Sequence, residues 1–330
     1  MRPSFYTGIP QNRHEVPAHL PIPGHEEQNH PSGYRPDAGL VDAVNVALLL
    51  GQPLLLTGEP GTGKTHLAFN LAWEFNYGCE VFETKSTSTA RDLFYYYDTV
   101  GRFYAAQTGG GSQRPLDYIT YNALGLAIIR SNPEENVRDL LPPDFKHGGA
   151  RRSVVLIDEV DKAPRDFPND LLNEVENLYF KIPELGNVRI SASPEMRPLI
   201  VITSNSEKHL PDAFLRRCVF YNIPFPDDQR LKDIIMSRIG GYFGDRKSPL
   251  LSDALAFFDT LRASGSLHKR PATAELIGWL ISLRENGAEI EQSLRQCPGV
   301  ARMCMSALIK SAEDQPVAQS VLDDWMNDSA

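Results

Sequence analysis

The segment from Gly58 to Thr65, which reads GEPGTGKT, restricts the possible folds of this chain more than any other feature. It matches the pattern G-x-x-x-x-G-K-[ST] at every fixed position. Three leucines, Leu54–Leu56, come before it, and a helical pattern over residues 66–75 follows it. This order of strand, glycine-rich loop and helix is the setting that the pattern requires. We therefore expect an α/β fold built around a phosphate-binding loop.

Each fixed residue of this loop is suited to holding a nucleoside triphosphate. The glycines let backbone N–H groups approach the β-phosphate, and the positive end of the helix dipole favours the anion. Lys64 is expected to reach the β- and γ-phosphate oxygens, and the Thr65 hydroxyl to bind Mg²⁺. We predict that the chain binds ATP with Mg²⁺ and hydrolyses it. The predicted nucleotide-binding residues of the loop are Gly58, Glu59, Pro60, Gly61, Thr62, Gly63, Lys64, Thr65 and His66.

A second motif follows about 90 residues later, where the apolar run Val154–Ile157 ends in Asp158 and Glu159. A strand of this kind delivers both carboxylates to the carboxyl edge of a parallel sheet, where ligands bind. Asp158 is expected to hold Mg²⁺ together with Thr65, and Glu159 to orient and deprotonate the attacking water. The next charged residues, Asp161 and Lys162, are expected to be solvated.

A third strand is predicted over Leu199–Ile202, and it leads to Asn205. This uninterrupted apolar run is typical of a strand that is buried on both faces of a parallel sheet. The Asn205 side chain is a candidate catalytic group that contacts the water or the γ-phosphate. An equally good interpretation from the residues alone is a cap for the following helix. Further strands are predicted over residues 80–84 and 219–223.

The segments between these strands contain more predicted elements. Helical spacing from about Thr89 places apolar and aromatic residues on one face. We interpret this face as core or subunit contact, and the alternative is that its aromatic residues grip a polypeptide or a base. The residues of this face are Leu93, Tyr96, Tyr97, Val100, Phe103 and Tyr104. Glycines 109–111 predict a flexible connection, followed by a helix over 118–130 and a loop over 132–152. A helix over 170–178 and a hairpin that turns at residues 186–187 come next.

Composition narrows the class of protein. The net charge of −9 argues against nucleic acid as the main partner, because such proteins carry basic patches or stripes. The four cysteines are far apart and form no CxxC pair, so neither the usual zinc patterns nor a disulfide framework is expected. The N-terminus lacks the layout of a signal peptide, and no apolar run is long enough to span a bilayer. We expect a cytoplasmic protein.

Three regions follow from these patterns. Residues 1–36 are rich in Pro, His, Asn and Gly and are expected to form an extended arm. Residues 37–226 contain the motifs and the predicted strands. Residues 227–330 show helical patterns only.

The sequences GEPGTGKT, VVLIDEVDKAP, VITSN and LPDAFLRRC resemble the AAA+ ATPases, and within them the MoxR branch. The resemblance is good over about residues 38–226 and loose over the helical tail. It implies a three-layer αβα core with a five-stranded parallel sheet in the order 5-1-4-3-2. A small all-helical lid domain is implied to follow.

The resemblance also implies roles for basic residues. In this family an arginine that follows the asparagine strand reaches into the ATP site of the neighbouring subunit, and here that role falls on Arg217 or on the adjacent Arg216. A second basic residue of the lid touches the γ-phosphate, which points to Arg270 or to Lys269 before it.

A trans-acting arginine implies a ring, commonly of six subunits. Members of the branch commonly act with a protein that contains a von Willebrand factor A domain, and the implied function is chaperone-like remodelling or maturation of a partner protein. Two alternatives remain open at this point. They are a nucleic-acid motor subunit and a slow nucleotide-gated switch in a defence or signalling assembly.

Overall fold

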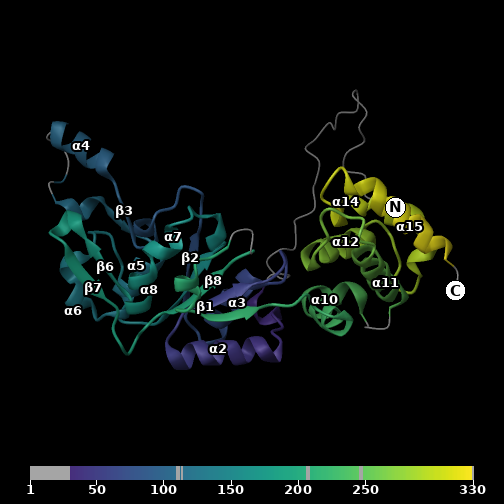
Figure 1. Ribbon diagram of the computed structural model, residues 1–330, viewed down its shortest axis with the longest axis horizontal. Coiled ribbons are helices and arrows are strands. Elements are labelled where there is room, and N and C mark those ends of the chain that lie inside the picture. Colours follow the sequence, from purple (N-terminus) through teal and green to yellow (C-terminus); the bar gives the residue numbers. More distant parts are fainter. Residues whose placement is uncertain (1–29, 109–111, 113, 206–208, 245–247, 329–330) are drawn as a thin grey trace, which may run out of the picture. The chain divides into compact units, whose positions relative to one another are not determined.

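The computed structural model describes residues 30–108, 112, 114–205, 209–244 and 248–328 (Figure 1). The expected N-terminal arm up to residue 29 and the glycines 109–111 lie outside this part of the chain. The described residues divide into two compact units. The core unit consists of residues 36–225, and the helical unit consists of residues 226–328 together with residues 30–35.

The core unit is built on a sheet of five parallel strands. In space their order is β2-β5-β8-β1-β9, which confirms the expected order 5-1-4-3-2. Both apolar runs that follow the phosphate-loop strand in the sequence lie in its interior. The strands are β1 (Leu54–Thr57), β2 (Gly78–Glu83), β5 (Ser153–Asp158), β8 (Leu199–Thr203) and β9 (Val219–Asn222).

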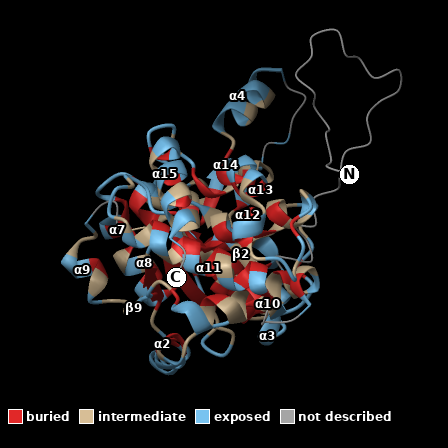
Figure 2. Cartoon of the chain, turned by 90° about the vertical axis from the view of Figure 1, so that its right-hand side faces the viewer, coloured by how far each residue is buried: buried red, intermediate tan, exposed pale blue. Residues whose placement is uncertain are grey.

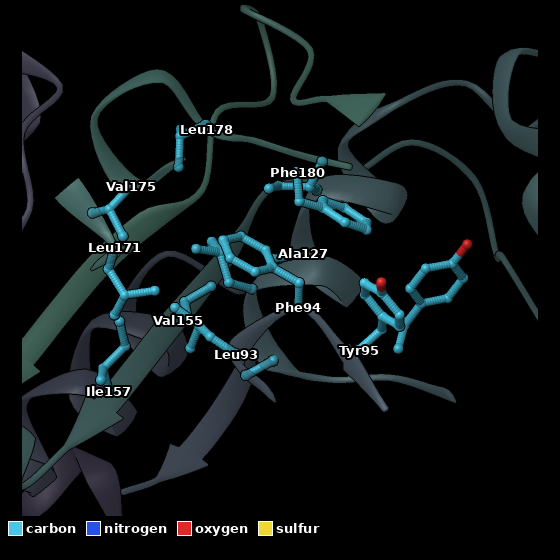
Figure 3. Packing of buried hydrophobic residues seen from close by; sticks show 14 of the residues in the cluster. Leu93, Phe94, Tyr95, Ala127, Val155, Ile157, Leu171, Val175, Leu178 and Phe180 are labelled. Atoms are coloured by element: carbon cyan, nitrogen blue, oxygen red, sulfur yellow. The ribbon is translucent and has the colours of Figure 1, made fainter. Parts of the chain in front are cut away.

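One face of this sheet is covered by α5 (Ala123–Ser131), α7 (Phe167–Asp170) and α8 (Leu172–Asn177). Figure 3 shows how strand residues such as Val155 pack against α5 residues such as Ala127. The buried apolar cluster on this face includes five side chains of the five-stranded sheet: Leu55, Val155, Ile157, Ile200 and Ile202. They alternate with residues that point to the opposite face.

The opposite face is covered by α2 (Ala38–Leu50) and α3 (Lys64–Glu74). Helix α2 packs on β1 and β9, and α3 packs on β2, β5 and β8. Tyr221 of β9 pairs with Leu56 of β1, so both side chains share this face, and the Tyr221 hydroxyl bonds to Asp37 at the start of α2. No described side chain of α3 belongs to the cluster on the first face. The core unit is therefore a three-layer αβα structure.

The prediction of a helix that begins at about Thr89 is wrong for the first part of this segment. Residues Ala90–Leu93 form a short 3-10 helix, Tyr95–Tyr97 form strand β3, and only Thr99–Thr108 form a helix, α4. Three consecutive tyrosines favour a strand, and this preference outweighed the apparent helical spacing.

The interpretation of this aromatic segment as core also needs correction. Tyr95 and Tyr97 are buried, but Val100, Phe103 and Tyr104 of α4 are 63%, 60% and 61% exposed. Helix α4 carries no buried residue and projects from the core unit (Figures 1 and 2). These three side chains therefore contribute nothing to the core of the chain.

The predicted helix over residues 118–130 and the predicted loop over residues 132–152 also differ from the structure. The helix expected over residues 118–130 begins only at Ala123, because Ile119–Tyr121 form strand β4, which pairs antiparallel with β3. The expected loop over residues 132–152 contains the short helix α6, Glu134–Val137. Short 3-10 helices lie at Pro115–Tyr118 and Arg138–Leu140.

The predicted hairpin is confirmed. Strands β6 (Tyr179–Ile182) and β7 (Val188–Ser191) pair antiparallel, with a 3-10 turn at Pro183–Leu185 between them. Gly186 and Asn187 both adopt positive φ angles, of 77° and 61°, as a tight turn requires. The helix expected over residues 170–178 is split, since α7 ends at residue 170 and α8 begins at residue 172.

The helical unit contains no strand among its described residues. Its centre is formed by large apolar side chains, including Phe257 and Trp279, whose rings lie 5.6 Å apart. A 3-10 helix at Pro31–Gly33 joins this unit through Gly33, whose carbonyl accepts a hydrogen bond from Ser237. The helices are α10 (Asp228–Phe243), α11 (Pro249–Ala263), α12 (Thr273–Glu285), α13 (Pro298–Met303), α14 (Met305–Leu308) and α15 (Asp314–Asn327).

Across the described part of the chain, no helix combines the length and the apolar character that crossing a bilayer requires.

Candidate nucleotide-binding site

The phosphate loop connects β1 to α3 at the carboxyl edge of the sheet. Gly58 has a φ of 140°, and a Cβ atom there would lie 2.6 Å from the carbonyl oxygen of Ile223. Only glycine therefore fits at the start of the loop. Gly61 and Gly63 also have positive φ angles, and α3 begins directly after Gly63. The backbone N–H groups of the loop therefore lie next to the N-terminus of α3, and both stabilise a bound anion.

Lys64 is 5% exposed, and its ammonium group lies within the loop. It donates hydrogen bonds of 2.8 and 3.0 Å to the carbonyl oxygens of Gly58 and Glu59. Burial lowers the pKa of Lys64, and the negative charges of Asp161, Asp158 and Glu159 act in the opposite direction. Thr62 Oγ1 donates to the same Glu59 carbonyl at 2.8 Å, so the loop is held by its own side chains. His66 is partly exposed on the first turn of α3.

Asp158 lies where the sequence pattern predicts, next to the end of the loop. The Thr65 hydroxyl donates a 2.9 Å hydrogen bond to Asp158 Oδ1, and the Thr203 hydroxyl donates a 2.6 Å bond to the same oxygen. Thr65 and Asp158 thus present two hard oxygen ligands side by side, which suits Mg²⁺. The residues at this position fit the metal that the motif implies.

Thr203 is a site residue that the sequence analysis did not single out. It is fully buried at the end of β8, beside β5 in the sheet. The only signal for it is its place directly after the third apolar run, two residues before Asn205.

Glu159 adopts a left-handed backbone conformation, with φ 55° and ψ 53°. Such a conformation costs about 1–2 kcal/mol for a residue with a Cβ atom, so its neighbours must hold it in place. The backbone N–H of Glu159 donates to Thr203 Oγ1 at 2.8 Å, and the Asn205 side-chain amide donates to Glu159 Oε1 at 3.0 Å. The structure thus brings Glu159 and Asn205 together, as candidates for the same chemical step.

Asp161 differs from the expectation that it is solvated, whereas Lys162 is exposed as expected. Asp161 is 3% exposed, and its Oδ1 accepts a 3.2 Å hydrogen bond from the backbone N–H of Asn205. Lys162 forms an ion pair with Glu159 Oε2. The 3-10 turn Val160–Lys162 explains both contacts, because it turns these side chains back toward the end of β5.

The candidate arginines Arg216 and Arg217 lie apart from this cluster. Arg217 donates to Glu176 Oε2 at 2.9 Å and to the carbonyl oxygen of Ala213 at 3.0 Å. Both arginines lie just before β9, separated from it by Cys218, at the amino edge of the sheet. The phosphate loop follows the carboxyl end of β1, so it lies at the opposite edge of the sheet from these arginines.

The candidate lid residues Lys269 and Arg270 belong to the helical unit. Both are exposed and lie in the loop before α12. The buried Asp314 at the start of α15 holds this loop, because it accepts hydrogen bonds of 2.8 and 3.0 Å from the backbone N–H groups of His268 and Lys269. These contacts lower the pKa of Asp314 to about 2.

Comparison with known proteins agrees with this geometry. No match was found among the curated proteins. Residues 54–225 match the family described as "ATPase family associated with various cellular activities (AAA)", and this range covers just over half of the chain. It begins at the first residue of β1 and ends after β9, so it contains the whole sheet and the phosphate-loop cluster. The chain belongs to the AAA ATPase family, whose members bind nucleotide and hydrolyse ATP.

Proposed function

We propose that this chain is a Mg²⁺-dependent ATPase of the MoxR branch that remodels or matures a partner protein. The observation that carries the enzymatic part is the hydrogen-bonded series that links Thr65, Asp158, Thr203, Glu159 and Asn205. Through Asp158 of β5 and Thr203 of the adjacent β8, it connects the Thr65 hydroxyl, the proposed Mg²⁺ ligand, to Glu159, the proposed general base.

The residues of this series have distinct roles in the proposed reaction. Thr65 and Asp158 would hold Mg²⁺, which supplies positive charge to the β- and γ-phosphates when bound. When ATP binds, the Lys64 ammonium group would release the carbonyl oxygens of Gly58 and Glu59 and donate hydrogen bonds to phosphate oxygens instead. Glu159 accepts the proton of the attacking water, and Asn205 orients the Glu159 carboxylate through its amide.

The position of Arg217 supports an action in trans. Leu54 pairs with Val219 and Thr57 with Asn222, so β1 and β9 run in register from the amino edge to the loop edge. A strand of four residues spans about 13 Å, which separates Arg217 from the phosphate loop of its own chain. An arginine at the amino edge is better placed for the site of a neighbouring copy, and we propose a ring, commonly of six subunits.

The remodelling activity is supported by two segments of the core unit that contact each other. They are residues 90–108 with 114–121, which we call the first insertion, and the β6–β7 hairpin. Phe94 of the first insertion stacks on Phe180 of the β6–β7 hairpin at 5.3 Å, and the Tyr95 hydroxyl donates to Glu184 of the hairpin at 2.8 Å. The hairpin and α4 are thereby connected, and α4 presents the exposed apolar stripe of Val100, Phe103 and Tyr104. Exposed apolar stripes of this kind mark protein contact sites.

The remaining parts of the proposal rest on the MoxR resemblance. A protein with a von Willebrand factor A domain is the proposed partner, and Arg270 or Lys269 is proposed to contact the γ-phosphate from the lid. The proposed location is the cytoplasm.

The first test is phosphate release from ATP by the purified chain and by Glu159→Gln, with and without a chelator of Mg²⁺. Removing a general base should lower turnover by about 10²–10⁴-fold, while ATP binding is retained. The oligomeric mass of both proteins with ATP is measured in parallel. Turnover that survives Glu159→Gln would reject the assigned base, and a monomer at every ATP concentration would reject the ring.

A further inference from the structure

Both carboxylate oxygens of Glu159 are engaged in this structure. Oε1 accepts the hydrogen bond from the Asn205 amide at 3.0 Å, and Oε2 forms the ion pair with the Lys162 ammonium group. The two partners differ in kind. The amide of Asn205 is neutral and comes from the end of β8, whereas the cation of Lys162 comes from the turn that follows Glu159 itself.

The local backbone fixes this ion pair. Glu159 is in the left-handed conformation, and the 3-10 turn from Val160 to Lys162 begins directly after it. This turn brings the side chain of residue 162 back over residue 159. The backbone N–H of Lys162 also donates to the carbonyl oxygen of Glu159 at 2.9 Å. The pair is therefore encoded within four consecutive residues.

We infer that Lys162 is a positioning residue that restrains Glu159 and thereby limits the rate of ATP hydrolysis. This inference rests on the proposed role of Glu159 as the general base. A base needs a free carboxylate oxygen within hydrogen-bond distance of the water from which it takes a proton. Each carboxylate oxygen has two lone pairs, so the contacts with Lys162 and Asn205 do not block proton transfer by occupancy alone. Together they hold the carboxylate in one orientation, and turning Oε2 toward the attacking water requires that the Lys162 contact opens.

Exposure sets the strength of this restraint. The Lys162 side chain is 48% exposed and the Glu159 side chain is 34% exposed. Ion pairs that are this accessible to water are weak and open readily. Lys162 therefore slows the enzyme without silencing it. The same accessibility allows an acidic group of another molecule to compete for Lys162 and so release Glu159.

The opposite role for Lys162 makes a different prediction. If the ammonium group assisted the reaction, for example by contacting the γ-phosphate, its removal would lower turnover. If the lysine restrains Glu159, its removal raises kcat and leaves the affinity for ATP unchanged. The two roles are therefore distinguished by the sign of the change in kcat.

The decisive variant is Lys162→Met in the full chain, with kcat and KM for ATP measured by phosphate release. We expect kcat to rise by about two- to fivefold, the range that the loss of one exposed ion pair supports, with KM unchanged. Lys162→Arg preserves the cation and should keep kcat near that of the parent chain. Lys146→Met, which removes an exposed lysine from the loop before β5, is the matched control and should change neither constant.

A double variant tests whether the effect passes through Glu159. Glu159→Gln combined with Lys162→Met should be as slow as Glu159→Gln alone, because the base that Lys162 restrains is absent. A Lys162→Met chain that is folded, binds ATP and shows equal or lower kcat than the parent would overturn the inference while leaving the ATPase itself standing. If neither chain hydrolyses ATP, both the inference and the proposed function are rejected.

Discussion

The hydroxyl of Thr203 donates a 2.6 Å hydrogen bond to Asp158 Oδ1 and accepts a 2.8 Å hydrogen bond from the backbone N–H of Glu159. One buried hydroxyl thus fixes the candidate metal ligand and the backbone of the candidate base together. Because Thr203 is fully buried, water cannot replace either hydrogen bond when the side chain is changed.

Replacing Thr203 by Val should therefore impair the site more than the loss of one oxygen atom suggests. Losing a hydrogen bond to a charged group costs about 1.5–3 kcal/mol, which corresponds to about a 10- to 100-fold lower turnover if it is lost in the transition state. Thr203→Ser keeps the hydroxyl and should retain most of the activity. Steady-state kinetics of both variants checks this prediction, and a Val variant as active as the Ser variant would contradict it.

Arg217→Ala should bind ATP normally and lose turnover by about 10³-fold or more, as expected for an arginine that stabilises the transferred phosphoryl group. Glu176→Gln removes only the carboxylate that pairs with Arg217 and serves as the matched control, with turnover maintained. ATP binding by fluorescence titration and phosphate release are the two measurements.

The action of Arg217 in trans can be tested by mixing two inactive chains. Lys64→Ala lacks a working phosphate loop but keeps its arginine, and Arg217→Ala has the reverse defect. A mixture should regain part of the turnover at sites that combine an intact loop with an intact arginine. No recovery in a mixture that forms mixed oligomers would argue that Arg217 does not act between copies.

Gly125 in α5 allows a test of how closely the first insertion packs against this helix. A Cβ atom at Gly125 would lie 1.9 Å from the backbone carbonyl oxygen of Phe94, so Gly125→Ala must displace either the helix or the insertion. We expect a loss of about 1–3 kcal/mol in the free energy of unfolding, the usual cost of overpacking. Urea denaturation followed by circular dichroism measures it.

Gly278 in α12 provides the control for this substitution. Apart from its chain neighbours and the backbone of its own helix, no described heavy atom lies within 4 Å of a Cβ at Gly278. Gly278→Ala should therefore be neutral or stabilise the chain by up to about 1 kcal/mol through its better helix propensity. Equal effects of the two substitutions would contradict the close approach of α5 and the insertion.

Asp259 of α11 makes stability depend on pH in the helical unit. Burial and the hydrogen bond and charge of Asp228 raise the pKa of Asp259 from 3.8 to about 6. The folded chain therefore keeps a proton that the unfolded chain releases, so stability falls as pH rises from 3.8 to about 6, and the full cost remains above this range. Asp259→Asn should raise the unfolding temperature above this range and flatten the dependence within it. Thermal unfolding across the range checks both, and an unchanged profile would contradict the prediction.

The sequence alone predicted the parts of this protein that depend on local patterns. The phosphate loop needs glycines at fixed spacing, so Gly58 and Gly63 are visible in the sequence and have the positive φ angles that only glycine tolerates well. The buried strands of a parallel sheet need uninterrupted apolar runs, and this pattern predicted β5, β8 and the carboxylates of Asp158 and Glu159 at the end of β5. The strand order came from the family resemblance, since no periodicity encodes which strands are neighbours.

Tertiary structure decided the contacts between segments that are distant in the sequence. Thr203 and Asp158 are 45 residues apart, and they meet only because β8 and β5 are adjacent in the sheet. Likewise, the strand preference of Tyr95–Tyr97 is realised only because β4 is available as a pairing partner. Helix α4 is exposed because no described element covers its apolar stripe. Helical and strand periods report which side of an element is apolar. They carry no information about what, if anything, packs against that side, because this depends on the whole chain.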